Sequence, residues 1–324
     1  MITRDVLIQN SRQFGTLMGL FVVVVIFTIL SPYFLTVSNL LNIAEQTSIN
    51  AIIAVGMTFV IIAAGIDLSV GSIVALSGVV LAGLMQGGQP APIAILIGLC
   101  VGVLCGVTNG LFISYGRLPA FIATLGMMSV ARGAALFYTD GRPISGFSAQ
   151  FRYLATGAVA SIPAPVIIMV VIYAAAHFVL RRTKLGRYTY AIGGNEEAAM
   201  LSGINTKFVK TAIYALCGFL SALAAVILTA RLNSAQPIAG MMYELDAIAA
   251  VVIGGTSLMG GEGKISGTLI GAFIMGILRN GLNLLGLSSF TQQIVIGSVI
   301  ILAVLIDMTL RRDRKFSFGK GIFS

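Results

Sequence analysis

Residues 92–115 decide the class of this protein. They read PIAILIGLCVGVLCGVTNGLFISY and contain no charged side chain. A helix needs about 20 mostly apolar residues to cross the hydrocarbon core of a bilayer, so this stretch is long enough to span a membrane. The whole chain of 324 residues has the same character, with 57% hydrophobic and 10% charged residues, against about 25% charged in a soluble domain. We expect a polytopic membrane protein and exclude a soluble enzyme.

Ten stretches of this kind follow one another along the chain. They lie near residues 14–35, 46–66, 69–85, 92–115, 118–138, 162–180, 211–230, 245–261, 266–285 and 290–308. The eighth and ninth are the weakest. Arg279 interrupts the ninth, and an acidic residue lies close to each end of the eighth. A re-entrant hairpin is the alternative there. The sequence predicts an all-α fold in a single transmembrane domain, residues 1–324, with about ten (8–10) transmembrane helices. Either arrangement keeps the two termini on one side.

The basic residues indicate which side that is. Of the 20 Lys and Arg residues, 15 fall in segments on the side of the N-terminus, whereas three, Arg142, Arg152 and Arg231, fall on the other side. Cytoplasmic loops of membrane proteins carry an excess of Lys and Arg. We therefore expect both termini and the 181–210 loop to be cytoplasmic. The net charge of +9 reflects this bias and does not indicate nucleic-acid binding.

Small residues are abundant in the apolar stretches. The chain has 38 glycines and no tryptophan, and Gly98, Gly102 and Gly106 share one face of a predicted helix. Small residues let membrane helices approach closely, so we expect tight packing within the chain rather than a dimer seam at this face. We also expect the three cysteines to be small core residues, because they lie in apolar runs without metal-ligand spacing. They are Cys100, Cys105 and Cys217.

A shift of 196 positions aligns residues 50–78 with residues 246–274 without a gap. It aligns Asn50 with Asp246 and Gly71 with Gly267. In each copy a glycine-flanked polar turn lies between two apolar runs. Paired helices that break in this way occur near transport paths. The alternatives are an internal duplication and a chance similarity between alanine- and glycine-rich segments. With ten spans, the two copies would be parallel rather than inverted.

Asp67 lies between two apolar runs, in Gly65-Ile66-Asp67-Leu68-Ser69-Val70-Gly71-Ser72. An acid inside a membrane domain is costly and is by default a functional hypothesis. The structural alternative is that Asp67 or Ser69 caps the start of the next helix by accepting hydrogen bonds from free amides. Both interpretations stay open from the sequence.

Other candidate sites are weak. His177 is the only histidine, has no carboxylate nearby in the sequence, and is best explained as an interfacial residue. Gly261-Glu262-Gly263-Lys264-Ile265-Ser266 superficially resembles a phosphate-binding loop, but the required glycine and hydroxyl positions hold Leu258 and Ile265. We find no nucleophile–base set and no cluster of metal ligands, and therefore predict no catalytic residue, no metal site and no enzyme activity.

The loop between Arg182 and Lys210 contains a short predicted helix. Asn195 is a typical N-cap residue, Glu196 and Glu197 follow at the positive end of the helix dipole, and Gly203 is a typical stop. Ala198 and Ala199 lie between them. This helix has two possible roles, packing at the membrane interface or presenting a knob to a cytoplasmic partner.

Several motifs together resemble the permease subunits of monosaccharide-importing ABC transporters, especially the ribose type, from about residue 30 to residue 308. The resembling stretches are Asn39-Leu40-Leu41-Asn42-Ile43, Ala54-Val55-Gly56-Met57-Thr58, Gly65 to Ser72, Leu185-Gly186-Arg187-Tyr188, Gly193-Gly194-Asn195-Glu196, Ser202-Gly203-Ile204 and Gly254-Gly255-Thr256-Ser257-Leu258. The combination is highly specific, whereas each motif alone is not.

The resemblance implies a homodimer in the inner membrane that binds a cytoplasmic ABC ATPase and receives sugar from a periplasmic binding protein. ATP is then hydrolysed by a separate subunit, and this chain needs no cofactor. Glu197-Ala198-Ala199 followed by Gly203 is similar to the Glu-Ala-Ala, Gly element with which such importers dock their ATPase. Downstream, Asn205-Thr206-Lys207 departs from the usual apolar ending.

Transport by alternating access would need only weak sugar contacts in the permease. Asn50, Asp67 and Ser69 are the predicted pathway residues, and Asn109 and Thr124 are further polar candidates. The rival class is a secondary, proton-coupled transporter or channel, in which Asp67 or Asp246 would carry the proton; a membrane-bound enzyme comes third. Ribose is the leading substrate, and other pentoses, hexoses and an inositol stay open.

Overall fold

The structure is a computed structural model that describes residues 4–319, with side-chain surroundings for residues 15–302, 304 and 305. Within this range most of the chain is helical. The helices are α1 (Arg4–Leu30), α2 (Val37–Ile62), α3 (Val70–Gln86), α4 (Ala91–Ser114), α5 (Ala120–Thr139), α6 (Ala149–Thr156), α7 (Ala164–Arg182), α8 (Lys184–Gly194), α9 (Glu196–Leu201), α10 (Thr206–Leu232), α11 (Tyr243–Ile253), α12 (Ile265–Leu284) and α13 (Ser289–Gly319).

Four strands of two residues each complete the described structure. They are β1 (Ile144–Ser145), β2 (Ala158–Val159), β3 (Ile162–Pro163) and β4 (Ser234–Ala235). β1 pairs with β4 and β2 pairs with β3, both antiparallel, so neither pair forms an extended sheet. The prediction of an all-α polytopic membrane protein is confirmed at this level.

Six of the described helices are long and apolar enough to cross a membrane: α2, α4, α5, α7, α10 and α12. Each of the ten predicted ranges overlaps one helix, namely α1 to α5, α7 and α10 to α13. α11 has 11 residues and is about 16 Å long, about half the thickness of the hydrocarbon core. The count of ten spans therefore stays a prediction.

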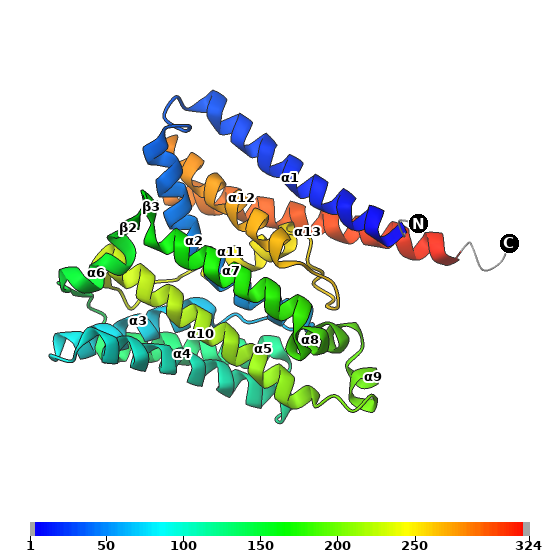
Figure 1. The fold of residues 1–324 in the computed structure, drawn as a ribbon, viewed down its shortest axis with the longest axis horizontal. Coiled ribbons are helices and arrows are strands. Elements are labelled where there is room, and N and C mark those ends of the chain that lie inside the picture. The colour runs from blue at the N-terminus through cyan, green and yellow to red at the C-terminus, as the bar shows by residue number, and fades with distance from the viewer. Residues whose placement is uncertain (1–3, 320–324) are drawn as a thin grey trace.

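The two ends of the molecule differ in what they carry. α8 and α9 lie at the end where α1 begins and α13 finishes, whereas α6, β2 and β3 lie at the opposite end (Figure 1). The two termini and the 181–210 loop thus share an end of the molecule. The assignment of that end to the cytoplasm still depends on the distribution of basic residues.

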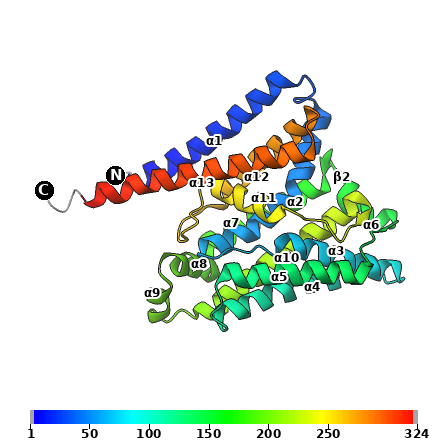
Figure 2. The same cartoon turned by 180° about the vertical axis from the view of Figure 1, so that it is seen from behind.

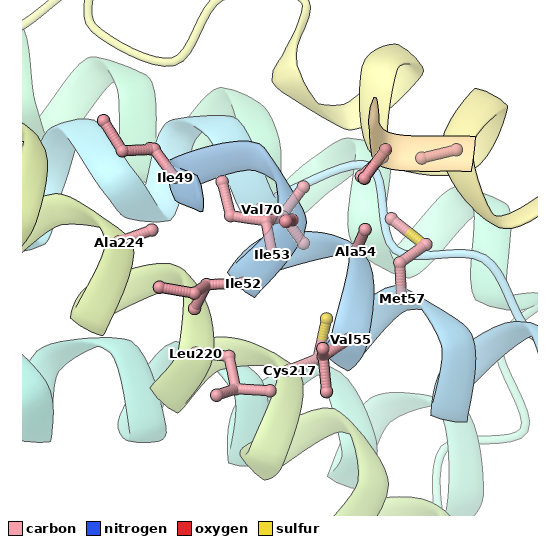
Figure 3. Close-up of a cluster of buried hydrophobic side chains, with 14 of the residues drawn as sticks. Ile49, Ile52, Ile53, Ala54, Val55, Met57, Val70, Cys217, Leu220 and Ala224 are labelled. Atoms are coloured by element: carbon pink, nitrogen blue, oxygen red, sulfur yellow. The ribbon is translucent and has the colours of Figure 1, made fainter. Parts of the chain in front are cut away.

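α2 forms the centre of the bundle. Its most apolar window is 83% buried, compared with 22% for α5 and 28% each for α4 and α7. Ile52 and Ile53 of α2 are fully buried, and Leu220 and Cys217 of α10 lie beside this helix (Figure 3). Helices at the outside of a membrane protein leave apolar side chains exposed to lipid, which explains the low burial of α4, α5 and α7.

Glycines allow α4 to approach α10 closely. A methyl group on Gly102 would collide with Gly218 and Ala222, and one on Gly106 with the carbonyl oxygen of Tyr214. The prediction that this glycine face packs within the chain is confirmed. The cysteine prediction holds for Cys217, which is buried, but it is wrong for Cys100, which is exposed on the outer α4.

Two non-helical segments interrupt the bundle, residues 63–69 before α3 and residues 233–242 before α11. Backbone groups inside a membrane domain need partners, because no water is available there. Arg132 of α5 meets this need by donating from Nη1 to the carbonyl oxygens of Pro237 (2.7 Å) and Ala239 (2.8 Å). α3, α5, α11 and α13 can be followed from behind in Figure 2.

The helices in which the two copies of the sequence echo begin differ in length. α2 has 26 residues and α11 has 11, so the alignment without a gap does not bring the ends of the two helices into register. Both copies do consist of a helix, a non-helical connection and a second helix. The duplication stays a prediction.

Candidate translocation and coupling sites

Asp67 lies just before α3 and is completely buried, with 0% of its surface exposed. Its Oδ1 accepts hydrogen bonds from the backbone N–H of Ser69 (2.9 Å) and from the Ser69 hydroxyl (2.6 Å), and Asn109 of α4 donates to the same hydroxyl (2.9 Å). The second oxygen, Oδ2, has no hydrogen-bond partner among the described groups, and Cys217 lies beside the carboxylate. Every polar partner of Asp67 here is neutral.

Asp67 resembles a helix cap, but it lies two residues before Ser69, the N-cap residue of α3, and bonds to Ser69 rather than to the helix amides. The Ser69 side chain itself accepts no bond from the helix amides. Asp67 instead fixes the residue at which the helix begins. Thr124 of α5 donates to the carbonyl oxygen of Ile66 (3.3 Å) and secures the same connection.

A second polar cluster, which we call the Asp246 cluster, consists of Asn50 of α2, Asp246 of α11 and Arg279 of α12. Asp246 Oδ2 accepts from Arg279 Nη2 at 2.6 Å and from Asn50 Nδ2 at 3.2 Å. The Asp246 side chain is 3% exposed, but that of Arg279 is 40% exposed. The cluster therefore joins three helices and extends from the core to the surface of the chain.

Further polar contacts continue from α2 onto α10 and α12. Arg231 approaches Glu45 (3.8 Å) and donates to Asn42 (3.2 Å). Asn39 and Asn280 exchange two side-chain hydrogen bonds of 3.1 and 3.0 Å. One face of α2 thus carries a continuous row of polar groups.

The structure divides the predicted pathway residues between two places. Ser69, Asn109 and Thr124 gather around Asp67, where they are buried, while Asn50 belongs to the Asp246 cluster. Sequence reasoning missed Arg279 as a site residue. Its position inside a predicted span was the signal that could have found it, because intramembrane charges pair with one another.

The predicted loop helix is present as α9 and has the predicted ends. Asn195 Oδ1 accepts from the N–H of Ala198 (2.9 Å), and Gly203 takes a left-handed conformation with φ +82°. Ala199 is 5% exposed and anchors the helix, whereas Leu201 is 82% exposed. Glu196 is held by an ion pair with Lys210 at 3.0 Å. The capped helix is confirmed, and it presents an apolar tip.

A close junction connects α8, the helix just before α9, with the bundle. The N–H of Gly261 donates to the carbonyl oxygen of Ile62, the last residue of α2 (2.8 Å), and Gly193 lies against the same carbonyl group. A cavity of about 760 Å³ opens beside the junction, between α9, the end of α2 and the connection from α4 to α5, with Ser114, Arg117 and Lys207 in its wall. α8 is thereby linked to α2 and to the segment that precedes α12, and α9 follows α8 after a single residue, Asn195.

Comparison with known proteins agrees with this architecture. Residues 39–304 match the profile of a family described as the permease component of the branched-chain amino acid transport system. The chain belongs to this permease family. It is a multi-pass protein of the inner membrane, and the resemblance stated from its motifs is confirmed at the level of the family.

Relatives in this family carry out sugar transport. The chain is 53% identical to the ribose import permease protein RbsC of Haemophilus influenzae, over 89% of this chain and 91% of the relative. It is 53% identical to RbsC of Bacillus subtilis (91% and 92%) and 42% identical to the D-allose transport system permease protein AlsC of Escherichia coli (93% and 93%). No solved structure matches the chain.

Proposed function

We propose that this chain is the membrane-spanning permease subunit of an ATP-driven ABC importer for a monosaccharide, with ribose as the leading substrate. The observation that carries this proposal is the 53% identity to ribose import permeases over about nine tenths of both chains. The 42% identity to an allose permease keeps hexoses as the next candidates.

The proposed assembly contains a second copy of the permease, a cytoplasmic ABC ATPase and a periplasmic binding protein. In it the chain crosses the membrane ten times, with both termini in the cytoplasm. α9 is the proposed docking element for the ATPase, together with its caps Asn195 and Gly203 and the intervening Glu196, Glu197, Ala198 and Ala199. Its exposed apolar tip, Met200 at 56% and Leu201 at 82%, supports a protein partner.

The junction supports a route for the mechanical signal. A displacement of α9 by the ATPase would move α8, and Gly193 of α8 lies directly against the end of α2. α2 carries Asn50 of the Asp246 cluster, so motion of its end reaches the polar groups in the bundle. Closely packed helices move as rigid bodies in alternating access, and glycine contacts without intervening side chains make this link short.

The proposed sugar path runs along the Asp246 cluster. Asn50, Asp246 and Arg279 offer amide, carboxylate and guanidinium groups to sugar hydroxyls, and Arg279 reaches the surface of the chain, where a second copy would close the path. Asp67 and Ser69 are assigned to the same pathway by the sequence, but their complete burial favours a supporting position behind it.

Uptake by proteoliposomes tests the function. The permease is reconstituted with its ATPase and the binding protein, and entry of radiolabelled ribose is followed. We expect uptake that needs ATP and survives a collapsed proton gradient. Uptake that stops with the gradient but continues without ATP would assign the chain to the secondary transporters. Allose as the preferred sugar would keep the importer class and change the substrate.

Glycine variants separate docking from signal transmission. Gly203→Val forces a β-branched residue into a left-handed conformation, so we expect weaker binding of the ATPase. Gly193→Ala should leave binding unchanged but abolish uptake, because the methyl group collides with Ile62. Gly194→Ala is the matched control, since nothing lies near an added methyl group there and its backbone is helical. Full ATPase binding by Gly203→Val would contradict the docking role of α9.

A further inference from the structure

A small cavity lies where the end of α7, α8 and the start of α12 meet. Its lining includes His177 and Arg181 of α7, Tyr190 of α8 and Lys264 before α12, together with Leu180, Ile265 and Ser266. Three of these seven side chains are basic and none is acidic. Arg181 and Lys264 come from segments far apart in the sequence, so the fold has brought these two cations together.

The backbone beside this cavity is also suited to an anion. Lys264 is the N-cap residue of α12 and its side chain makes no capping bond, while the N–H groups of Gly267 and Thr268 both return to the Lys264 carbonyl oxygen. Ile265 and Ser266, the first residues of this 20-residue helix, line the cavity, so the positive end of the helix dipole lies next to Arg181 and Lys264. Both residues belong to the segment 261–266, whose sequence does not match an ATP-binding loop.

Tyr190 holds this segment in place. Its hydroxyl donates to the carbonyl oxygen of Gly263 at 2.8 Å. Burial raises the pKa of the Tyr190 phenol above its ordinary value, so the hydroxyl stays protonated and keeps this donor role. Glu262, the nearest acid in the sequence, is exposed and does not line the cavity.

The cavity lies beside a lipid-facing surface. α7 is only 28% buried over its apolar window, and Val170, Val171 and Phe178 are 56–61% exposed. The last turn of α7 carries Arg181 and Arg182, which places this end at the predicted cytoplasmic interface. An occupant with a negative head and apolar chains fits a basic cavity next to an exposed apolar helix.

We propose that the basic groups around the mouth of this cavity bind the phosphate of an anionic phospholipid from the inner leaflet; the cavity itself, at about 30 Å³, has room for about one water-sized group. Basic pockets between transmembrane helices on the cytoplasmic side suit such head groups. Arg181 and Lys264 hold the phosphate from two sides, the positive end of the α12 dipole adds to the attraction, and the acyl chains lie along α7. A bound lipid would fix α8 against the segment before α12, next to the junction with α2.

Lipid binding by the full-length protein provides the test. The purified permease is equilibrated with nanodiscs of phosphatidylglycerol or phosphatidylcholine, and retained lipid is measured by native mass spectrometry. We expect selective retention of phosphatidylglycerol and a loss of affinity of about tenfold or more in the R181Q/K264Q variant, since each basic group contributes substantially to such binding. The R182Q/R187Q control removes the same charge from exposed positions outside the cavity and should retain the lipid.

Several results would overturn the proposal. Equal losses in the two double variants would reduce the effect to general surface charge, and equal retention of phosphatidylcholine would remove the need for an anionic head. Displacement of the lipid by millimolar inorganic phosphate would assign the cavity to a free anion instead. If R181Q/K264Q fails to fold, the single variants K264Q and R187Q decide in the same assay, and R181K/K264R should retain the lipid.

Discussion

Asp67 and Asp246 are both buried carboxylates, with 0% and 3% of their surfaces exposed, but the protein satisfies them differently. Asp67 has neutral hydrogen-bond partners and no contact with the surface. Asp246 has an arginine partner whose side chain is 40% exposed. A buried carboxylate with only neutral partners is suited to a fixed structural position, whereas one that shares its charge with an exposed group can respond to a ligand or a partner.

Loss of Arg279 should have the largest effect. Arg279→Met leaves the Asp246 carboxylate buried without its counter-ion. Breaking a fully buried pair costs about 3–5 kcal/mol, and we expect the lower end of this range because the Arg279 side chain is 40% exposed and partly screened by solvent. Thermal unfolding of the detergent-solubilised protein is the measurement, and we expect a large fall in the unfolding midpoint. Asp246→Asn should cost less, because the exposed Arg279 side chain can turn toward polar surroundings.

The double variant D246N/R279M is the control for this pair. It should recover most of the stability lost in Arg279→Met, because no buried charge is left without a partner. We expect ribose uptake to stay low in the double variant, since both groups that line the proposed path have been removed. Wild-type stability in Arg279→Met would show that the pair contributes little to the fold.

Removal of the Ser69 hydroxyl should be the next largest effect. Ser69→Ala takes one donor away from Asp67 and one acceptor away from Asn109, and an unsatisfied buried polar group costs about 1–3 kcal/mol. The unfolding midpoint of Ser69→Ala is compared with that of Ser129→Ala, whose exposed hydroxyl donates only to its own helix. Equal midpoints for the two variants would mean that the Asp67 site is not held by this network.

Asn50 should affect transport more than stability. Asn50→Ala removes one hydrogen bond to Asp246 while Arg279 stays in place, so the expected cost is about 0.5–1.5 kcal/mol. Gln46→Ala is the matched control, because Gln46 lies one turn away on α2 and makes a similar amide contact, to Asn42. We expect reduced uptake for Asn50→Ala alone; equal uptake by both variants would exclude Asn50 from the path.

The sequence predicted the helical class, the approximate positions of the ten longer apolar helices and both ends of α9, because these depend on apolar length and on local capping residues; it did not predict α6 or α8. It did not predict the separation of Asn50 from Asp67. Twelve residues of α2, 51–62, and a short turn separate Asn50 from Asp67. Asn50 joins a cluster with residues of α11 and α12, whereas the Asp67 network includes a residue of α4, and both arrangements depend on how distant helices pack. The prediction that Cys100 is a core residue was wrong for the same reason, since an apolar run does not indicate which face of a helix is exposed to lipid.

Asp67→Asn should have the smallest effect, and it decides between the two interpretations of this residue. The amide oxygen of Asn can accept the same bonds from the N–H and hydroxyl of Ser69, so the variant loses chiefly the interaction of the negative charge with the start of α3, about 0.3–1 kcal/mol. Asp67 is 0% exposed, so a sugar cannot contact its carboxylate in this arrangement of the helices. We therefore expect normal expression, normal ATPase activity and normal ribose uptake, measured in the same proteoliposomes as Asn50→Ala. A variant that assembles and hydrolyses ATP but transports poorly would show that the charge itself acts in transport, and the contrast between Asp67 and Asp246 would then no longer hold.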